Sequence, residues 1–276
     1  MTGTALGDRD GAVRALGHPA LDDRPLLRGR CVILTGAGGG IGRVMAEAFV
    51  CAGATLAATD IAQGPLDDLM AEIEPHVAAL GVGPPFARAF DATDLTAFET
   101  FVGEVVAREQ YIDGLVNCAG SWLAAPYAEI DLGAFALAVD RNLTTAFNGC
   151  RTVLPIMTGQ RSGSVVNVAS TAGEFGSITP ASHYAAAKGG VIGLTKSLAR
   201  EVGEFGVRVN AISPGPTDTV ALGADTPEKK SAAGARTLFG RLGQPEEIAY
   251  CAVFLLSDLA SFVTGQVLGV NGGSRL

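Results

Sequence analysis

The chain has 276 residues, of which 48% are hydrophobic and 17% are charged, and its formal net charge at pH 7 is −8. The length suits one large α/β domain or two small ones. The acidic balance, with no cluster of Lys and Arg, argues against nucleic acid as a partner, and the longest apolar runs, such as residues 249–256, are too short to span a bilayer. We therefore expect a soluble protein that binds neither nucleic acid nor membrane.

Five cysteines are scattered along the chain, with no C-x-x-C pair and no histidine close to any of them. This spacing predicts reduced thiols rather than disulfides or a zinc site. The N-terminus lacks the charged start and apolar core of a secretory signal. The expectation is a cytoplasmic protein with no bound metal.

Residues 1–28 are rich in Gly, Asp, Arg and Pro and show no periodicity, which predicts an N-terminal arm that is partly disordered or forms an oligomer contact. From residue 29 to 276, β-rich apolar runs alternate with helical periodicity. Strands are expected at residues 30–35, 54–59, 86–90, 112–116, 163–169, 207–212 and 265–270, and helices at residues 43–51, 66–80, 95–108, 132–157, 181–203 and 245–256. Such alternation is typical of an α/β fold. We expect a single doubly wound Rossmann-type domain, a parallel sheet of about seven strands with helices on both faces, and a substrate lid around residues 216–241.

The first expected strand leads directly into a glycine-rich turn, residues 36–42, and a helix follows. In such a unit the backbone N–H groups and the helix dipole can receive a pyrophosphate, and glycine leaves room for it. The spacing is G-x-x-x-G-x-G rather than the G-x-G-x-x-G fingerprint. Flexible loops also contain glycine runs, but the position between a strand and a helix indicates nucleotide binding.

Acidic and small residues stand at the next expected strand ends. Asp60 lies about twenty residues beyond the glycine turn, where a carboxylate can accept the ribose hydroxyls and repel a 2′-phosphate, although an aspartate here could also cap a helix or turn. Gly39 leaves no basic side chain in the loop to meet an extra phosphate. Both features favour NAD over NADP. Asp91 and the turn 117–120 follow the third and fourth strands, at the edge where a doubly wound sheet binds its ligand.

Tyr184 and Lys188 are four residues apart, so on a helix their side chains leave the same face. An ammonium beside a phenol favours phenolate and moves the pKa of the tyrosine toward neutrality. Ser170 ends the fifth strand, and its hydroxyl could hold the oxygen of a carbonyl or alcohol. A surface tyrosine and a solvated lysine also occur at this spacing by chance. Asn142 is a polar amide in an apolar helical pattern and needs a partner, in a structural network or a proton relay.

Together, in this order and at fitting separations, the motifs resemble the short-chain dehydrogenase/reductase family from residue 28 to the C-terminus. The matching segments are residues 35–42, 117–120, 170, 184–188, 214–215, 243–247 and 264–273. The resemblance implies an Asn-Ser-Tyr-Lys tetrad, in which the tyrosine is the acid/base, the serine orients the substrate oxygen, the lysine binds the nicotinamide ribose and lowers the tyrosine pKa, and the asparagine supports a water that leads protons to solvent. These residues are Asn142, Ser170, Tyr184 and Lys188. It also implies cofactor contacts at Gly36, Gly38, Gly40, Ile41, Gly42, Asp60, Asp91, Asn117, Ala119, Gly120, Tyr184, Lys188, Pro214, Gly215, Thr217 and Thr219.

The chain departs from the family pattern in three ways. Cys118 stands where the family often has a second asparagine. Ser170 lies fourteen residues before Tyr184 where thirteen is common, so Thr171 is an alternative hydroxyl, although Ser170 precedes x-x-Gly173 as the family serine does. The N-terminal arm is longer than usual.

The function that follows is NAD-dependent oxidoreduction of a secondary alcohol and a ketone by hydride transfer. Trp122, Phe175 and Leu222 lie beyond strand ends and predict a largely apolar substrate pocket, although Trp122 could equally pack in the core. Alternatives are a 3-oxoacyl thioester reductase of the same family, which would more often use NADPH and a basic docking surface, and a catalytically silent NAD-binding scaffold or sensor. An epimerase or dehydratase of the longer related family would need a further substrate domain. The resemblance also implies a homotetramer, or a homodimer, with the helices at 132–157 and 181–203 forming a dimer face.

Overall fold

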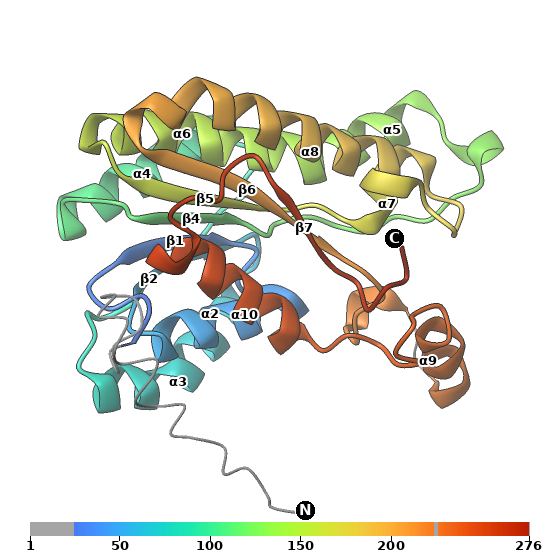
Figure 1. Ribbon diagram of the computed structural model, residues 1–276, viewed down its shortest axis with the longest axis horizontal. Coiled ribbons are helices and arrows are strands. Elements are labelled where there is room, and N and C mark those ends of the chain that lie inside the picture. The colour runs from blue at the N-terminus through green and yellow to red at the C-terminus, as the bar shows by residue number, and fades with distance from the viewer. Residues whose placement is uncertain (1–24, 224–225, 276) are drawn as a thin grey trace, which may run out of the picture.

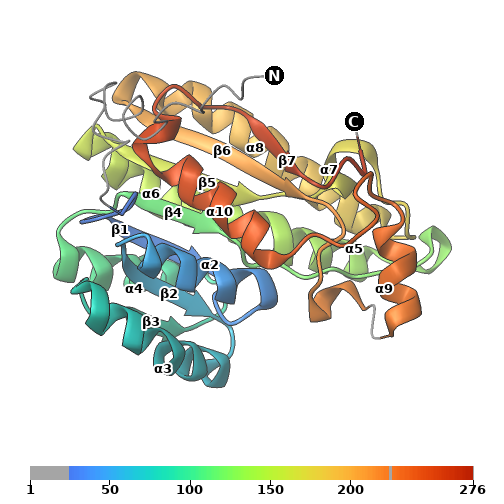
Figure 2. The same ribbon diagram turned by 60° about the horizontal axis from the view of Figure 1, so that its bottom comes forward.

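In a computed structural model of the chain, residues 25–223 and 226–275 are described. Seven strands form one parallel sheet with the order β3-β2-β1-β4-β5-β6-β7 (Figure 2). The strands are β1 Cys31–Thr35, β2 Thr55–Asp60, β3 Phe86–Ala89, β4 Gly114–Asn117, β5 Gly163–Val168, β6 Val207–Pro214 and β7 Val267–Val270. The order reverses between β1 and β4, and the carboxyl ends of these two strands therefore flank the crevice where such sheets bind ligands.

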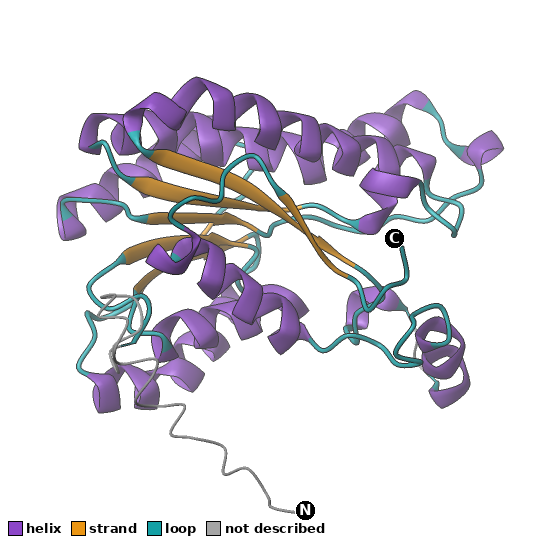
Figure 3. Cartoon of the chain, viewed as in Figure 1, coloured by secondary structure: helices purple, strands orange, loops and turns teal. Residues whose placement is uncertain are grey.

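Helices cover both faces of the sheet, and the short ones gather at its carboxyl edge. The helices α2, α3 and α10 lie on one face and α4, α6 and α8 on the other (Figure 1), and Figure 3 shows the strands in orange between these two layers. Their bounds are α2 Gly40–Cys51, α3 Gln63–Leu80, α4 Leu95–Glu109, α5 Leu132–Val139, α6 Thr145–Gln160, α7 Thr171–Phe175, α8 Ser182–Val202, α9 Pro227–Gly234 and α10 Pro245–Leu256. The doubly wound α/β fold is confirmed.

Each face of the sheet has its own apolar core. Met45 and Phe49 of α2 are fully buried on one side, and Phe98 and Phe101 of α4 are fully buried on the other. β1 is buried along its whole length, as expected for an apolar run inside a parallel sheet. No helix in the described part of the chain is long and apolar enough to cross a membrane.

Most expected elements are present within a few residues of their expected bounds, and three differences bear on function. The helix expected at 132–157 contains a π-helical turn, Asp140–Thr144, between α5 and α6. The short helices α7 and α9 were not predicted, because elements of five and eight residues carry too little periodicity to be recognised.

The N-terminal arm was predicted to extend to residue 28, and its last residues pack against the domain. Leu27 is fully buried, and its N–H donates to the carbonyl of Ala52 at 2.8 Å. Residues 26–30 therefore belong to the packed domain. The rest of the predicted arm, residues 1–24, lies outside the described residues.

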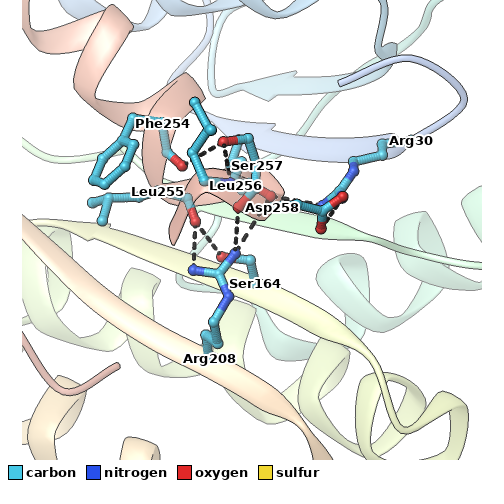
Figure 4. Close-up of polar contacts among 9 residues, drawn as sticks. Arg30, Ser164, Arg208, Phe254, Leu255, Leu256, Ser257 and Asp258 are labelled. Atoms are coloured by element: carbon cyan, nitrogen blue, oxygen red, sulfur yellow. Dashed lines mark hydrogen bonds and ion pairs between the residues drawn. The ribbon is translucent and has the colours of Figure 1, made fainter. Parts of the chain in front are cut away.

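Two arginines hold the C-terminal end of α10 against the sheet (Figure 4). The guanidinium of Arg208, on β6, donates to the carbonyls of Leu255 and Ser257 at 2.7 and 3.2 Å. Arg30 donates to the carbonyl of Leu256 and forms an ion pair with Asp258. These contacts satisfy carbonyls that a helix end leaves without intrahelical partners and place positive charge at the negative end of the helix dipole. Burial nevertheless lowers the pKa of Arg208 to about 10.

The two ends of the segment predicted as a lid, residues 216–241, lie close together. Thr217 and Gly243 form a parallel bridge. The N–H of Asp218 donates to the carbonyl of Gly243, and the N–H of Gly243 donates to the carbonyl of Pro216. Beyond this stem, Arg241 forms a two-pronged ion pair with Glu247 in the first turn of α10. The two ends of the lid are therefore joined at a hydrogen-bonded stem.

Candidate active site

A cavity of about 1140 Å³ lies at the carboxyl ends of the strands. It collects residues from the whole length of the chain, from the glycine turn to the C-terminal tail. The residues predicted for the site that line this cavity are Gly36, Gly38, Gly40, Ile41, Gly42, Asp60, Asp91, Ala119, Gly120, Trp122, Asn142, Ser170, Tyr184, Lys188, Pro214, Gly215, Thr217, Thr219 and Leu222.

Two predicted site residues do not line the cavity. Asn117 is buried behind it, where its Nδ2 donates to Asn167 Oδ1 at 2.8 Å and to the carbonyl of Ala146 at 3.3 Å. The Asn117 side chain therefore forms a buried link between β4, β5 and α6, and its predicted cofactor contact stays a prediction. Phe175, predicted for the substrate pocket, is half exposed at the end of α7 and lies outside the cavity wall. The sequence predicted an apolar residue beyond a strand end, but it did not predict that α7 places this residue outside the cavity.

Packing within the protein explains two glycines of the turn. A Cβ on Gly42 would overlap the carbonyl oxygen of Gly36, and a Cβ on Gly36 would lie 2.8 Å from the backbone of Ala119. Gly36 also has a φ of +70°, which favours glycine. By contrast, a Cβ on Gly39 would meet only the carbonyl of Gly36, at 3.4 Å. From the sequence, we expected glycine at all these positions because it leaves room for a phosphate. At Gly36 and Gly42 the close approach of the protein's own backbone already requires glycine.

A threonine hydroxyl joins the two strands that flank the switch point. Thr35 Oγ1, at the end of β1, accepts hydrogen bonds from the N–H groups of Cys118 and Ala119 at 3.1 and 3.0 Å. This bond shapes the turn after β4, where a Cβ on Gly120 would lie 2.7 Å from Asn142 Oδ1 and 3.4 Å from Lys188 Nζ. The turn therefore approaches the predicted tetrad more closely than any larger residue would allow.

The two strand-end aspartates have different local bonds. Asp60 Oδ2 accepts from the N–H of Gly38 at 2.9 Å, which ties the end of β2 to the glycine turn. Asp91 Oδ1 accepts from both the N–H and the hydroxyl of Thr93, in a turn that leads toward α4. Both carboxylates line the cavity. Asp60 keeps a second oxygen for a ligand, with only a 3.3 Å bond from Ala62.

Helix α7 brings Ser170 to Tyr184. Ser170 caps α7, since its Oγ accepts from the N–H of Ala172 at 3.1 Å. A Cβ on Gly173 would lie 2.6 Å from the backbone of Lys188, so glycine lets α7 pack directly on α8. The Tyr184 side chain forms a hydrogen bond with Ser170. Of the two candidate hydroxyls, Ser170 and Thr171, the geometry favours Ser170.

The pKa of Tyr184 is raised, which is opposite to the direction expected from the sequence. Burial is the largest cause, the hydrogen bond with Ser170 opposes it, and proximity to Cys118 adds to it. Lys188 is not among the causes, because its ammonium is directed elsewhere: Nζ lies 5.9 Å from the centre of the tyrosine ring and donates to the carbonyl of Val168 at 2.7 Å. The lysine and tyrosine share a helix face, as predicted, but the ammonium of Lys188 does not contribute to the shift in the pKa of Tyr184.

Lys188 is itself strongly desolvated. It is 5% exposed, and burial lowers its pKa to about 8. A buried amine that keeps its charge at neutral pH costs stability. Side chains held in such unfavourable surroundings are common at functional sites, where selection for activity offsets the loss.

We expect Lys188→Met to be more stable than the wild type at pH 7, although it removes a predicted catalytic group. The unfolded chain holds the lysine proton up to about pH 10.4, whereas the folded chain releases it near pH 8. Between these values the unfolded state binds more protons, so the stability of the wild type rises with pH relative to the variant. Melting temperatures of both proteins at pH 7 and pH 9.5 test this: the advantage of the variant should shrink at the higher pH, and an advantage that grows would contradict it.

The π-helical turn holds Asn142. Its Nδ2 donates to the carbonyls of Ser121 and Ala138, each at 3.0 Å. Its Oδ1 is buried and has no partner in the described structure. An extra residue in one helical turn commonly marks a functional position. Here it directs an asparagine to the turn that follows β4, facing the cavity.

The cavity wall fits a dinucleotide by its own chemistry. Four buried polar atoms without a protein partner belong to cavity-lining residues: Thr59 Oγ1, Ser121 Oγ, Asn142 Oδ1 and Ser274 Oγ. Buried polar groups normally find partners, so these point to a polar ligand or ordered water. The glycine turn opens α2, whose N-terminus can receive a pyrophosphate. Within residues 25–223 and 226–275, no group of three or more His, Cys, Asp or Glu side chains is placed to hold a metal ion.

Sequence reasoning missed several cavity residues. Arg236 follows α9 and Arg275 stands near the C-terminus, and both line the cavity. No sequence motif contains both arginines, because only the three-dimensional course of residues 216–241 and of the tail after β7 brings them to the cavity. Ser121, next to the recognised turn 117–120, could have been found by extending that motif by one residue.

Comparison with known proteins agrees with this geometry. The family model described as Enoyl-(Acyl carrier protein) reductase matches residues 36–275. The chain is 39% identical over 248 residues to 3-oxoacyl-(acyl-carrier-protein) reductase of Thermotoga maritima, covering 90% of this chain and 98% of that protein. It is 35% identical over 252 residues to 7alpha-hydroxysteroid dehydrogenase of Escherichia coli K12, covering 91% and 96%. The solved structure of a 3-oxoacyl-(acyl-carrier protein) reductase with bound NAD from Brucella melitensis has a TM-score of 0.81 at 34% identity, covering 99% and 97%.

The chain belongs to the short-chain dehydrogenase/reductase family, which confirms the resemblance seen in its motifs. It is an oxidoreductase of that family, and the family binds a nicotinamide cofactor.

Proposed function

We propose that this protein catalyses hydride transfer between NAD(H) and a secondary alcohol or ketone, with Tyr184 as the acid/base. The observation that carries the proposal is the Tyr184–Ser170 hydrogen bond inside the cavity that also contains the glycine turn and Asp60. One cavity thus contains the proton donor Tyr184, the hydroxyl of Ser170 that can orient a substrate oxygen, and the glycine turn that can bind a nucleotide.

The residues would divide the work as follows. The nicotinamide ring, when bound, supplies the hydride donor or acceptor at its C4 atom. Tyr184 donates a proton to the ketone oxygen during reduction, or takes it from the hydroxyl during oxidation, while Ser170 holds that oxygen. Lys188 would bind the nicotinamide ribose, and Asn142 would hold a water that returns the proton to solvent. The cofactor would be held by the glycine turn, by Asp60 at the adenosine ribose, and by residues 214–219.

The raised pKa of Tyr184 favours reduction at neutral pH. A buried phenol that keeps its proton is ready to act as a general acid toward a ketone. Oxidation requires the phenolate, so its rate is expected to rise with pH. We therefore propose ketone reduction as the direction that this site performs best near pH 7.

NAD is the cofactor that the local charges favour. Asp60 Oδ2 is bonded to the glycine turn, and its carboxylate stands where a 2′-phosphate would meet negative charge. The names of the relatives support a second candidate, reduction of a 3-oxoacyl thioester. The carboxylate of Asp60 argues against a cofactor with a 2′-phosphate in either reaction.

The substrate would have a largely apolar body. Trp122 and Leu222 line the cavity together with Leu137 and Ile178, all of them beyond the ends of strands. We further propose a cytoplasmic homotetramer or homodimer in which α6 and α8 form a face between subunits. Partly exposed Phe147 on α6 and small residues such as Gly193 on α8, where a Cβ would meet nothing within 4 Å, would allow close contact.

The proposal is tested with a panel of ketones and secondary alcohols, and turnover is measured from the change in NADH or NADPH absorbance. The panel should contain alicyclic, aromatic and steroid ketones and one 3-oxoacyl thioester, such as acetoacetyl-coenzyme A. We expect turnover of at least one apolar ketone, with kcat/KM at least tenfold higher for NADH than for NADPH. NADH binding without turnover of any compound would favour the silent scaffold.

The variant Asp60→Ser tests whether Asp60 determines the preference for NADH over NADPH. Loss of the carboxylate removes a ribose acceptor and the repulsion of a phosphate, so the NADH/NADPH ratio of kcat/KM should fall by at least tenfold. An unchanged ratio would show that Asp60 serves only to cap the glycine turn through Gly38.

A further inference from the structure

Charge is unevenly distributed around the cavity of this acidic protein. The aspartates that line it include Asp60 and Asp91, at the ends of β2 and β3. The cationic side chains Arg236 and Arg275 line the same cavity from the lid segment and the C-terminal tail. Neither arginine forms an ion pair with a carboxylate in the described part of the chain: Arg275 donates only to the carbonyl of Ser274, at 3.0 Å.

The backbone ties these two arginines to one end of the cavity. The N–H of Leu238, two residues after Arg236, donates to the carbonyl of Gly272 at 2.8 Å. Asn271 then folds the tail back, since its Nδ2 donates to the carbonyl of Arg275 at 3.3 Å.

This end of the cavity adjoins the predicted reaction centre and lies far from Asp60. The N–H of Gly215, at the end of β6, donates to the carbonyl of Val270 at 3.0 Å, next to the tail. Asp60 ends β2, four strands away from β6 in the sheet. With a spacing of about 4.8 Å between neighbouring strands, the separation is about 19 Å. The arginines are therefore not placed to meet a phosphate on the adenosine ribose.

A third group at this end lacks a partner. Ser274 Oγ is buried, belongs to a cavity-lining residue and has no hydrogen-bond partner in the described structure. It directly precedes Arg275. A hydroxyl donor and two planar guanidinium groups on the wall of one cavity would form a suitable donor set for a carboxylate, which arginine binds through two parallel hydrogen bonds.

We propose that Arg236, Arg275 and Ser274 bind a terminal carboxylate on the substrate, so that the alcohol or ketone has an apolar body with an anionic end. This deepens the proposed function and rests on it for the identity of the reacting group. It changes the expectation of a wholly apolar substrate, because the apolar cavity wall contacts the body and the arginines contact the end. Selection against neutral ketones follows, since each arginine would otherwise be left without its anion.

The test compares methyl-ketone acids, CH₃CO(CH₂)ₙCOO⁻ with n from 2 to 8, with their methyl esters. Trp122 is the only tryptophan in the chain and lines the cavity, so its fluorescence reports binding whether or not turnover occurs. At the chain length that spans the site, we expect the acid to bind at least tenfold more tightly than the ester. Arg236→Met and Arg275→Met should each remove most of that difference by weakening the binding of the acid. Arg200→Met, an exposed arginine late in α8, should preserve it.

The outcomes separate this proposal from the reaction. Acid-selective binding that depends on the arginines, without turnover, supports the carboxylate site and counts against the proposed hydride transfer. Equal binding of acid and ester, or acid selectivity that survives both substitutions, overturns the carboxylate site and leaves the reaction standing. A rise in the KM for NADH in Arg236→Met, with acid selectivity intact, also overturns it and assigns this arginine to the cofactor.

Discussion

Tyr184→Phe is expected to lower kcat by at least about 10²-fold, and by as much as about 10⁴-fold, the range that positioned acid/base groups contribute. The substitution removes one oxygen, which is the proposed proton donor and the partner of Ser170. The ring remains and can still fill its place on α8. Affinity for NADH should therefore change little. Steady-state kinetics and a fluorescence titration with NADH measure the two effects separately.

Ser170→Ala is the informative companion to Tyr184→Phe. It keeps the phenol but removes the hydrogen bond that opposes the effect of burial on the tyrosine, so the pKa of Tyr184 should rise further. In the oxidative direction, the pH at which activity rises should then shift upward. If Tyr184→Phe reduced NADH binding and turnover to the same extent, the tyrosine would be a binding residue rather than the acid/base.

Gly42→Ala is expected to destabilise the protein severely, although it adds a single methyl group. That Cβ would overlap the carbonyl oxygen of Gly36. Gly42 lies in the first turn of α2 and Gly36 packs closely on Ala119 in the turn after β4, so neither backbone can move without disturbing these contacts. Overpacking typically costs about 1–3 kcal/mol, and a separation of 2.0 Å between the new Cβ and the Gly36 oxygen puts this variant at the upper end, about 3 kcal/mol. At about 2–4 °C per kcal/mol for a chain of this size, the melting temperature should fall by about 6–12 °C.

Gly103→Ala is the matched control for this prediction. Gly103 lies in the middle of α4, where a Cβ would meet nothing within 4 Å. The same chemical change should there raise stability by about 0.5–1 kcal/mol, because alanine loses less conformational entropy in a helix. Equal melting temperatures for the two variants would show that the glycine turn has more freedom than its contacts indicate.

The strand-and-helix alternation was enough to predict the fold, because buried parallel strands are recognisable as short apolar runs. Helix α10 has the bounds that Pro245 and the apolar run to Leu256 predict. Elements without such patterns were missed. The π-helical turn at Asn142 leaves no mark in the sequence, since the residues around it fit an ordinary helix equally well.

Within the site, motifs predicted which residues gather but not how their charges act. Tyr184 and Lys188 share a helix face, as their spacing requires, yet the ammonium turns to the carbonyl of Val168. Only the tertiary packing provides that acceptor. Asn117 likewise stands in the expected motif but is bonded to Asn167 on the neighbouring strand, because β4 and β5 place the two residues opposite each other.

The stem formed by Thr217 and Gly243 separates a segment that can vary during evolution from the strand β6 and the helix α10, which must keep their positions. Because the bridge and its flanking hydrogen bonds close the excursion at its base, residues beyond it can be exchanged, lengthened or shortened without altering the register of β6 or the start of α10. Ligand preference can thus diverge in the part of this segment that follows the proposed cofactor contacts Thr217 and Thr219, while the strands that carry the site stay unchanged.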